Sequence, residues 1–217
     1  LKAEQQGPSF DDIRAAARRT WNDDLGRIRV EGGTEAQKKV FYTGLYHALI
    51  HPNVLSDVNG EYPAMESAEI RTAEGNRYTV FSLWDTYRNL HQLLTLVYPE
   101  RQLEMVRSMV GMYREWGWLP KWELYGRETF TMEGDPSIPV IVDTWMKGLR
   151  DFDMDAAYEA MRKSATTPGA RNRMRPDIDP YIEKGYVPLG FYARDLSGDN
   201  SVSHALEYYI ADHALSL

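Results

Sequence analysis

Apolar residues recur every three or four positions through most of the chain, and this spacing places them on one face of an α-helix. The pattern is clearest over residues 202–217, where it continues without interruption. The predicted buried face of that helix consists of Val202, Ala205, Leu206, Tyr209, Ile210, His213 and Leu217. Further helices are predicted over residues 9–25, 34–51, 84–98, 99–116, 138–149 and 154–161, with one helical turn over 180–184. Consecutive helices of this kind predict an all-α fold with antiparallel neighbours.

Polar residues and glycine mark the ends of several predicted helices. Ser9 and Asp153 are N-cap residue types and stand just before apolar periodic stretches. Thr34 and Gln37 have the spacing of a capping box, in which each residue bonds the backbone of the other. Gly117 stops the helix that precedes it.

Two stretches break the helical pattern. In residues 53–83, the segments 69–72 and 77–80 could pair around the turn at 73–76, which predicts a small β-hairpin inserted among the helices. Residues 118–135 show no periodicity and predict an irregular loop between two apolar helices.

Charge and composition exclude several function classes. The formal net charge is −7, which argues against a general attraction to nucleic acid or anionic lipid. No cysteine is present, so disulfides, thiolate zinc sites and cysteine nucleophiles are excluded. No window approaches the ~20 apolar residues of a membrane-spanning helix. Because the sequence opens on Leu1 and ends within a well-patterned helix, we expect it to be part of a longer protein.

The stretch 81–88, with the sequence FSLWDTYR, combines three side chains suited to holding a sugar. Trp84 offers a flat apolar surface, Asp85 two hydrogen-bond acceptors and Arg88 a rigid set of donors. Asp85 and Arg88 are three residues apart, so they can share one helix face. The simpler alternative is a helix-capping aspartate with a local ion pair and a core tryptophan.

The loop that follows is rich in tryptophans and carboxylates. Trp122, Glu123 and Glu128 lie in it, and its four acidic side chains are Glu123, Glu128, Glu133 and Asp135. Paired carboxylates near aromatic rings are the ingredients of glycoside hydrolysis, in which one acid and one base flank the bond. A solvated acidic loop whose tryptophans fill the helix junction explains the same composition.

Longer stretches of the sequence resemble glycoside hydrolase family 92. The resemblance is carried, in chain order, by GGT-AQKKVFYTGLYH (32–47), FSLWDTYR (81–88), YPER (98–101), GWLPKWEL (117–124), ET--M-GDPS-PVIVDT--KG (128–148), KGYVP (184–188) and SVSHALEYYIADHAL (201–215). It implies a secreted or periplasmic, cell-envelope α-mannosidase that acts on the ends of mannose-containing glycans, inverts the anomeric configuration and depends on Ca2+.

The resemblance also implies the domain organisation. Residues 1–30 would be a linker helix, and residues 31–217 would be the N-terminal half of an (α/α)6 catalytic barrel, truncated at its C-terminal end. Half a barrel leaves an apolar flank, so we expect either the missing half or self-association to cover it.

Site residues follow from the resemblance only where motifs match. Trp84 and Asp85 match the pair that contacts the terminal mannose, and Arg88 belongs to the same motif. Trp122, Glu123 and Glu128 sit in a motif typical of the family and are further candidates for substrate binding. The general acid and base would lie beyond Leu217, so the chain alone is expected to be inactive, and no calcium ligand or linkage preference is assigned.

Two other functions stay open from the residues. One is a different (α/α) barrel glycosidase that uses Glu123 or Glu128 as its general acid. The other is a non-catalytic, helical sugar-binding module in which the tryptophans grip a partner.

Overall fold

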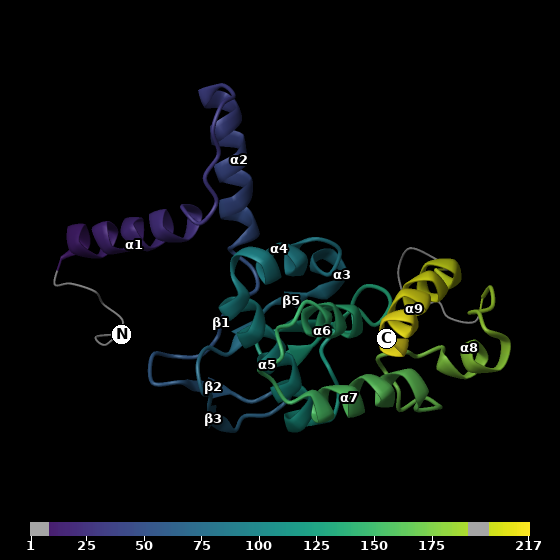
Figure 1. The fold of residues 1–217 in the computed structure, drawn as a ribbon. Coiled ribbons are helices and arrows are strands. Elements are labelled where there is room, and N and C mark those ends of the chain that lie inside the picture. Colours follow the sequence, from purple (N-terminus) through teal and green to yellow (C-terminus); the bar gives the residue numbers. More distant parts are fainter. Residues whose placement is uncertain (1–8, 191–199) are drawn as a thin grey trace.

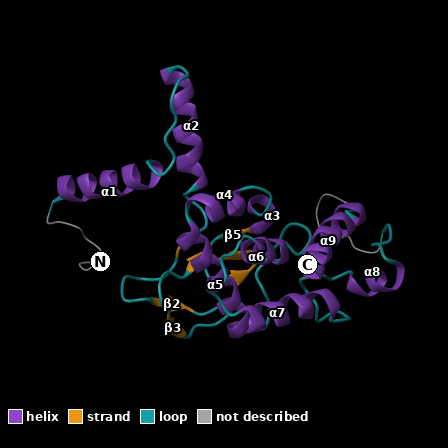
Figure 2. Ribbon diagram, viewed as in Figure 1, coloured by secondary structure: helices purple, strands orange, loops and turns teal. Residues whose placement is uncertain are grey.

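The computed structural model describes residues 9–190 and 200–217, and helices dominate this part of the chain (Figures 1 and 2). The helices are α1 (Phe10–Leu25), α2 (Glu35–Ala48), α3 (Leu83–Thr86), α4 (Leu90–Val97), α5 (Pro99–Trp116), α6 (Ser137–Met146), α7 (Met154–Thr166), α8 (Ile178–Lys184) and α9 (Ser201–Ser216). The strands are β1 (Asn53–Val54), β2 (Glu61–Pro63), β3 (Ile70–Thr72), β4 (Tyr78–Thr79), β5 (Phe81–Ser82), β6 (Trp122–Leu124) and β7 (Arg127–Glu128). The predicted helical fold is therefore confirmed, with small sheets beside the helices.

The predicted helix caps form as expected. Ser9 and Thr34 each complete a capping box with the residue three positions later. The Asp153 carboxylate accepts a 3.0 Å hydrogen bond from the Ala156 backbone at the start of α7. Gly117 ends α5 with φ 93°, a left-handed conformation that favours glycine.

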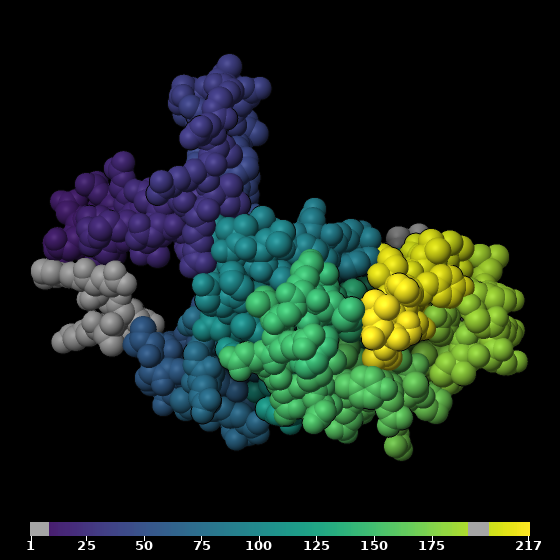
Figure 3. All heavy atoms as spheres, in the orientation of Figure 1, coloured from purple at the N-terminus to yellow at the C-terminus, as the bar shows by residue number. Residues whose placement is uncertain are grey.

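Helices α1 and α2 project from the rest of the molecule as an arm (Figures 1 and 3). The end of α1 is tied to the start of α5, because Asp24 pairs with Arg101 at 3.2 Å and its carbonyl accepts a 2.9 Å bond from the Tyr98 hydroxyl. On α2, Val40 is 74% exposed. The division of the chain near residue 30 stays a prediction.

The predicted β-hairpin is wrong in its pairing. Strands form within residues 69–72 and 77–80, but β3 pairs with β2, and β4 pairs with β1. The Tyr78 backbone N–H donates a 2.9 Å bond to the Ser108 hydroxyl, which holds β4 against α5. Since β4 is attached to a helix, the intervening turn does not fold β4 back onto β3.

The segment 118–135 is not the irregular loop that its sequence predicts. Strand β6 pairs antiparallel with both β5 and β7, so Glu123 lies opposite Phe81 on one side and Glu128 on the other. These strands are two or three residues long. Such strands are too short to show the alternation that identifies a strand in a sequence.

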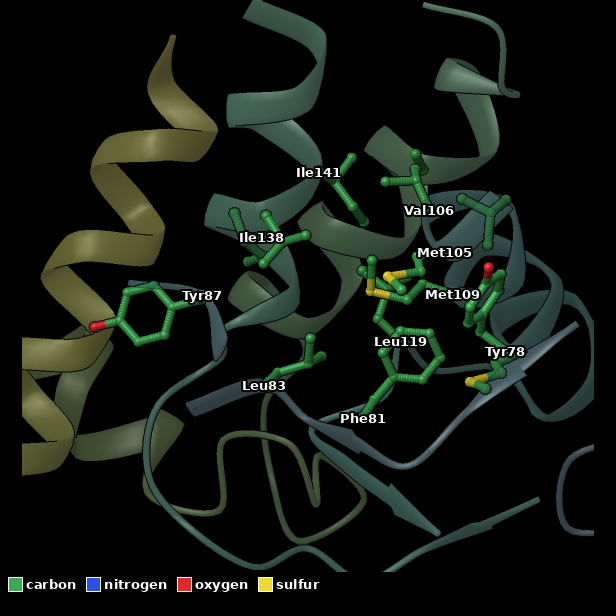
Figure 4. Packing of buried hydrophobic residues seen from close by; sticks show 14 of the residues in the cluster. Tyr78, Phe81, Leu83, Tyr87, Met105, Val106, Met109, Leu119, Ile138 and Ile141 are labelled. Carbon is green, nitrogen blue, oxygen red and sulfur yellow. The ribbon is translucent and has the colours of Figure 1, made fainter. Parts of the chain in front are cut away.

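The main core lies where α5 and α6 pack together over the β5–β6–β7 sheet (Figure 4). Met105, Val106 and Met109 of α5 are almost completely buried, as are Ile138 and Ile141 of α6. These side chains hold the sheet and the segment that follows β5 in place.

The core also determines which side chains of residues 81–88 reach the surface. Phe81, Leu83 and Tyr87 are buried in the main cluster (Figure 4). The side chains that remain at the surface, half-buried or exposed, include those of Trp84, Asp85 and Arg88. Burial of three neighbours thus turns the predicted sugar-holding side chains outward.

Helix α9 packs on a different face from the predicted one. Val202 is 69% exposed, Leu206 56% and Ile210 43%, and His213 is exposed as well. The buried face consists of Ser201, His204, Ala205, Tyr208 and Ala211. Because apolar residues occur on both sides of this helix, its periodicity did not decide which side packs against α6.

Candidate functional site

Arg88 lies at the surface, beside the rings of the half-buried Trp84 and the buried Tyr87. Its guanidinium carbon is 5.1 Å from the centre of the Trp84 ring and 4.6 Å from that of Tyr87. At such distances the cation is attracted to the electron-rich ring faces. The structure therefore brings Trp84 and Arg88 together, as the sequence predicts.

Asp85 does not form the helix cap and local ion pair of the simpler alternative, while its predicted role in holding a sugar stays a prediction. Its carboxylate accepts a hydrogen bond from the Ser82 side chain, and Ser82, not Asp85, is the N-cap of α3. The ion pair of Arg88 is formed with Glu207 of α9. Asp85 is therefore neither a helix cap nor the salt-bridge partner of Arg88, and it remains exposed beside Trp84.

Glu207 is a site residue that the sequence analysis missed. Its carboxylate accepts a 2.6 Å bond from the Tyr87 hydroxyl and a 2.5 Å bond from Arg88. Burial, together with the bond to Glu207, raises the pKa of Tyr87, so this hydroxyl stays protonated and donates. In Figure 4 the Tyr87 oxygen points toward α9. Glu207 lies within a matched motif, but no local signal links it to a residue 120 positions earlier.

A cleft of about 310 Å³ opens beside Trp84. It is lined by Trp84, Met132, Glu133, Ser203, Leu206 and Glu207. A second cleft of about 360 Å³ contains Tyr87 and Arg88 together with residues of α6 and the second half of α9. Trp84 and Arg88 therefore border neighbouring clefts, while Asp85 lines neither of them.

The loop before α6 closes tightly on α9. Phe130, Met132 and Gly134 all have positive φ values, of 58°, 66° and 74°. Such backbone conformations are uncommon for residues other than glycine and often occur at functional sites. A Cβ at Gly134 would lie 2.5 Å from the Cβ of Glu207, so the loop and helix touch at this point.

Glu123 is a fully buried carboxylate with several hydrogen-bond donors around it. The Thr79 hydroxyl donates to it at 2.8 Å, the Val80 N–H at 3.0 Å and the Gly126 N–H at 2.5 Å. Burial raises its pKa, although these donors oppose the rise. Glu123 lines neither of the two clefts and its carboxylate already has these donors, which argues against its predicted role in substrate binding.

Glu128 is similarly enclosed. It accepts backbone bonds from Lys121 at 2.8 Å, Trp122 at 3.0 Å and Phe130 at 2.8 Å. Burial raises its pKa as well. These bonds fix the path of the chain around the sheet, and they leave Glu128 in a poor position for general acid catalysis or for sugar contact.

Trp122 is half-buried on β6 and lines neither cleft. Its backbone pairs with Ser82, next to the segment that carries Trp84. Trp122, Glu123 and Glu128 thus lie in the sheet that supports the site, apart from the side chains that form the cleft.

No group of three or more acidic or histidine side chains that could hold a metal ion occurs within residues 9–190 and 200–217. Within the same ranges, none of the helices has the length and apolar character required to cross a membrane.

A family model and two solved structures that this chain resembles all point to the same family. The catalytic-domain model of glycosyl hydrolase family 92 matches residues 1–217. A family 92 α-mannosidase from Bacteroides thetaiotaomicron, solved in complex with mannoimidazole, is 35% identical with a TM-score of 0.87, over 99% of this chain and 27% of its own. A family 92 inverting mannosidase from the same organism is 31% identical with a TM-score of 0.88, over 99% of this chain and 29% of its own.

A curated fungal relative is also several times longer than the part that this chain matches. It is an uncharacterized secreted glycosidase of Arthroderma benhamiae, 26% identical over 215 residues. The match covers 96% of this chain and 24% of that protein. The chain thus spans roughly a quarter of the length of the relatives that it matches.

Proposed function

The chain belongs to glycosyl hydrolase family 92, and we propose from this premise that it forms the sugar-holding part of an exo-acting α-mannosidase. The enzyme would remove terminal α-linked mannose from glycans with inversion of configuration. Both Bacteroides relatives are described as mannosidases, and one of them as inverting. The observation that carries the proposal for this chain is the cleft beside Trp84.

The cleft has the chemistry that a monosaccharide requires. The C–H face of a pyranose can stack on the Trp84 ring, while its hydroxyls can donate to carboxylates. Glu133 and Glu207 line the same cleft and supply such acceptors. Arg88, held beside Trp84, adds a donor at the edge of the site.

Proton transfer is proposed to come from residues outside this chain. An inverting glycosidase places a general acid and a general base about 6.5–9.5 Å apart, with room for water between them. Glu123 and Glu128 do not suit these roles, because backbone donors surround their buried carboxylates. This disfavours the alternative of a glycosidase that uses either of them as its acid.

Further parts of the proposal rest on the family resemblance. They are dependence on Ca2+, secretion or a cell-envelope location, and a fold in which residues 31–217 form half of an (α/α)6 barrel.

Calorimetry of the 217-residue chain with methyl α-mannoside tests the proposal. We expect the chain to bind this sugar more tightly than methyl α-glucoside, to lose binding on Trp84→Ala and to release no mannose from a chromogenic α-mannoside. Trp21→Ala, which alters a half-buried tryptophan on α1, is the matched control. If the Trp84→Ala variant binds methyl α-mannoside as tightly as the unaltered chain, the proposed sugar site beside Trp84 is refuted. If the pure chain releases mannose, the proposal that the general acid and base lie outside this chain is refuted.

A further inference from the structure

Glu133 has one carboxylate oxygen that is paired and one that is not. Its Oε1 accepts a 3.0 Å hydrogen bond from the Asn200 side chain at the start of α9. Its Oε2 is shielded from solvent and has no hydrogen-bond partner among the residues that the structure describes. A shielded carboxylate oxygen without a donor is unfavourable, so a donor is expected to satisfy it when the site is occupied.

Trp84 lines the same cleft and carries a group of the complementary hydrogen-bonding type. Its indole Nε1–H is shielded and likewise lacks an acceptor within the described part of the chain. A sugar hydroxyl can both donate and accept a hydrogen bond, so hydroxyls can satisfy a carboxylate oxygen and an indole N–H together. Glu133 and Trp84 both line the 310 Å³ cleft.

The backbone holds Glu133 at this position. Met132 before it and Gly134 after it have φ values of 66° and 74°. The close approach of Gly134 to Glu207 presses the loop against α9, and the bond from Asn200 fixes the carboxylate from the same helix. Glu133 is thus presented to the cleft by contacts on both sides.

The size of the cleft limits its occupant. A volume of about 310 Å³ lies at the lower end of the range for ligand sites, which is roughly 300–1,000 Å³. Met132 and Leu206 supply apolar wall beside the indole, so the cleft combines apolar surface with few polar groups. This composition suits one pyranose ring better than an extended oligosaccharide.

We propose that Glu133 is a specificity-determining residue that accepts a hydrogen bond from one hydroxyl of the mannose stacked on Trp84. The inference rests on the proposed function, since it assigns a contact within that sugar site. Glu133 binds the sugar and takes no part in proton transfer, and its contact selects sugars that carry the matching hydroxyl.

Calorimetry of the intact chain with methyl α-mannoside and its 2-, 3-, 4- and 6-deoxy analogues tests this contact. We expect Glu133→Gln to weaken binding of the parent sugar about tenfold, as for loss of one charge-assisted hydrogen bond. One deoxy analogue should bind the unaltered chain about tenfold more weakly. Glu133→Gln should cause no further loss for that analogue.

Two variants accompany the test. Glu133→Asp keeps the charge but withdraws the oxygens from the cleft, so it should lose the same discrimination. Glu74→Gln makes the same charge change at an exposed residue far from the cleft and should bind like the unaltered chain.

The outcomes separate the inference from the proposed function. If Trp84→Ala abolishes binding while both Glu133 variants bind all five sugars like the unaltered chain, the Glu133 contact is refuted and the mannose site stands. An equal loss for the parent sugar and every analogue would also refute it, because that pattern reflects a structural role. If the unaltered chain binds none of the sugars, the proposed function falls and the Glu133 contact falls with it.

Discussion

Glu207 accepts a hydrogen bond from Arg88, which lies 119 residues earlier in the chain, at a distance of 2.5 Å. The same carboxylate accepts the Tyr87 hydroxyl at 2.6 Å. Because Tyr87 is buried in the main core and Arg88 lies against Trp84, this carboxylate connects α9 to both the core and the sugar site. The geometry of the site therefore depends on how α9 docks.

Replacing Glu207 tests this connection. We expect Glu207→Gln to lower the free energy of unfolding by about 1–2 kcal/mol. Most of the loss should come from the Tyr87 bond, since Arg88 is 46% exposed and exposed ion pairs contribute little. Chemical denaturation is the measurement, with Glu183→Gln on α8 as an exposed control. If the bond to Tyr87 dominates, the double variant Tyr87→Phe with Glu207→Gln should have nearly the same free energy of unfolding as Glu207→Gln alone. A double-variant loss equal to the sum of the two single-variant losses would contradict this.

Glu123 should behave as a structural residue. Glu123→Gln replaces one acceptor oxygen with an NH2 group, which then faces either the Val80 N–H that bonds Oε2 or the Gly126 N–H that bonds Oε1. The free energy of unfolding should fall by about 2 kcal/mol, because a buried donor loses its acceptor. Glu61→Gln, at an exposed strand position, is the control. Unchanged stability would reopen the possibility that Glu123 is free to act as an acid.

Gly134 should tolerate no side chain. Gly134→Ala introduces a Cβ 2.5 Å from Glu207 and also strains a backbone with φ 74°. Gly169→Ala is a matched control, because its φ is 83° but nothing lies within 4 Å of the added Cβ. The control isolates the backbone strain, about 1 kcal/mol. A clearly larger loss for Gly134→Ala in thermal unfolding would measure the close contact with α9, and equal losses would contradict that contact.

Stability should also depend on pH through His91. This buried side chain donates from Nδ1 to Gln102 at 2.9 Å and accepts from Thr86, within the FSLWDTYR segment, at 3.1 Å. Burial lowers the pKa of His91 from 6.5 to about 4. Between those values the unfolded chain binds a proton that the folded chain does not, so this contribution to stability falls as the pH falls.

Denaturation between pH 7 and pH 4 measures the effect. The contribution of His91 should decline by up to about 1.4 kcal/mol per pH unit below pH 6.5. His91→Gln should remove this part of the slope while lowering stability at pH 7, since the hydrogen bonds are altered. Identical slopes for the two proteins would show that His91 titrates normally in the folded state.

Local signals in the sequence were sufficient for most helices. Ser9, Thr34 and Asp153 cap the helices that they were expected to cap, because capping depends on residues within one turn. The motif that holds Trp84 was found in the same way. The outward orientation of Trp84 follows from the burial of its neighbours Phe81, Leu83 and Tyr87, and that burial is known only from the structure.

Features that depend on distant partners were not predictable from local signals. Glu123 and Glu128 looked like loop carboxylates, but they lie opposite each other in paired strands that are too short to recognise. Glu207 reaches the site only through the docking of α9, on a face that periodicity did not identify. Glu133 was one of four acids in the loop, and only the cleft distinguishes it from the others.

The apolar face of α9 that remains exposed should cause self-association. Val202 and Ile210 are 69% and 43% exposed, and an apolar face of this kind is covered in most soluble proteins. If residues 31–217 form half of a barrel, Val202→Ser with Ile210→Ser should shift the chain toward the monomer in sedimentation at high concentration. Leu96→Ser, at a 76% exposed position on α4, should leave association unchanged. If the unaltered chain is already monomeric, this result would count against an uncovered barrel flank. If the double variant still associates, the contact between copies lies on another surface.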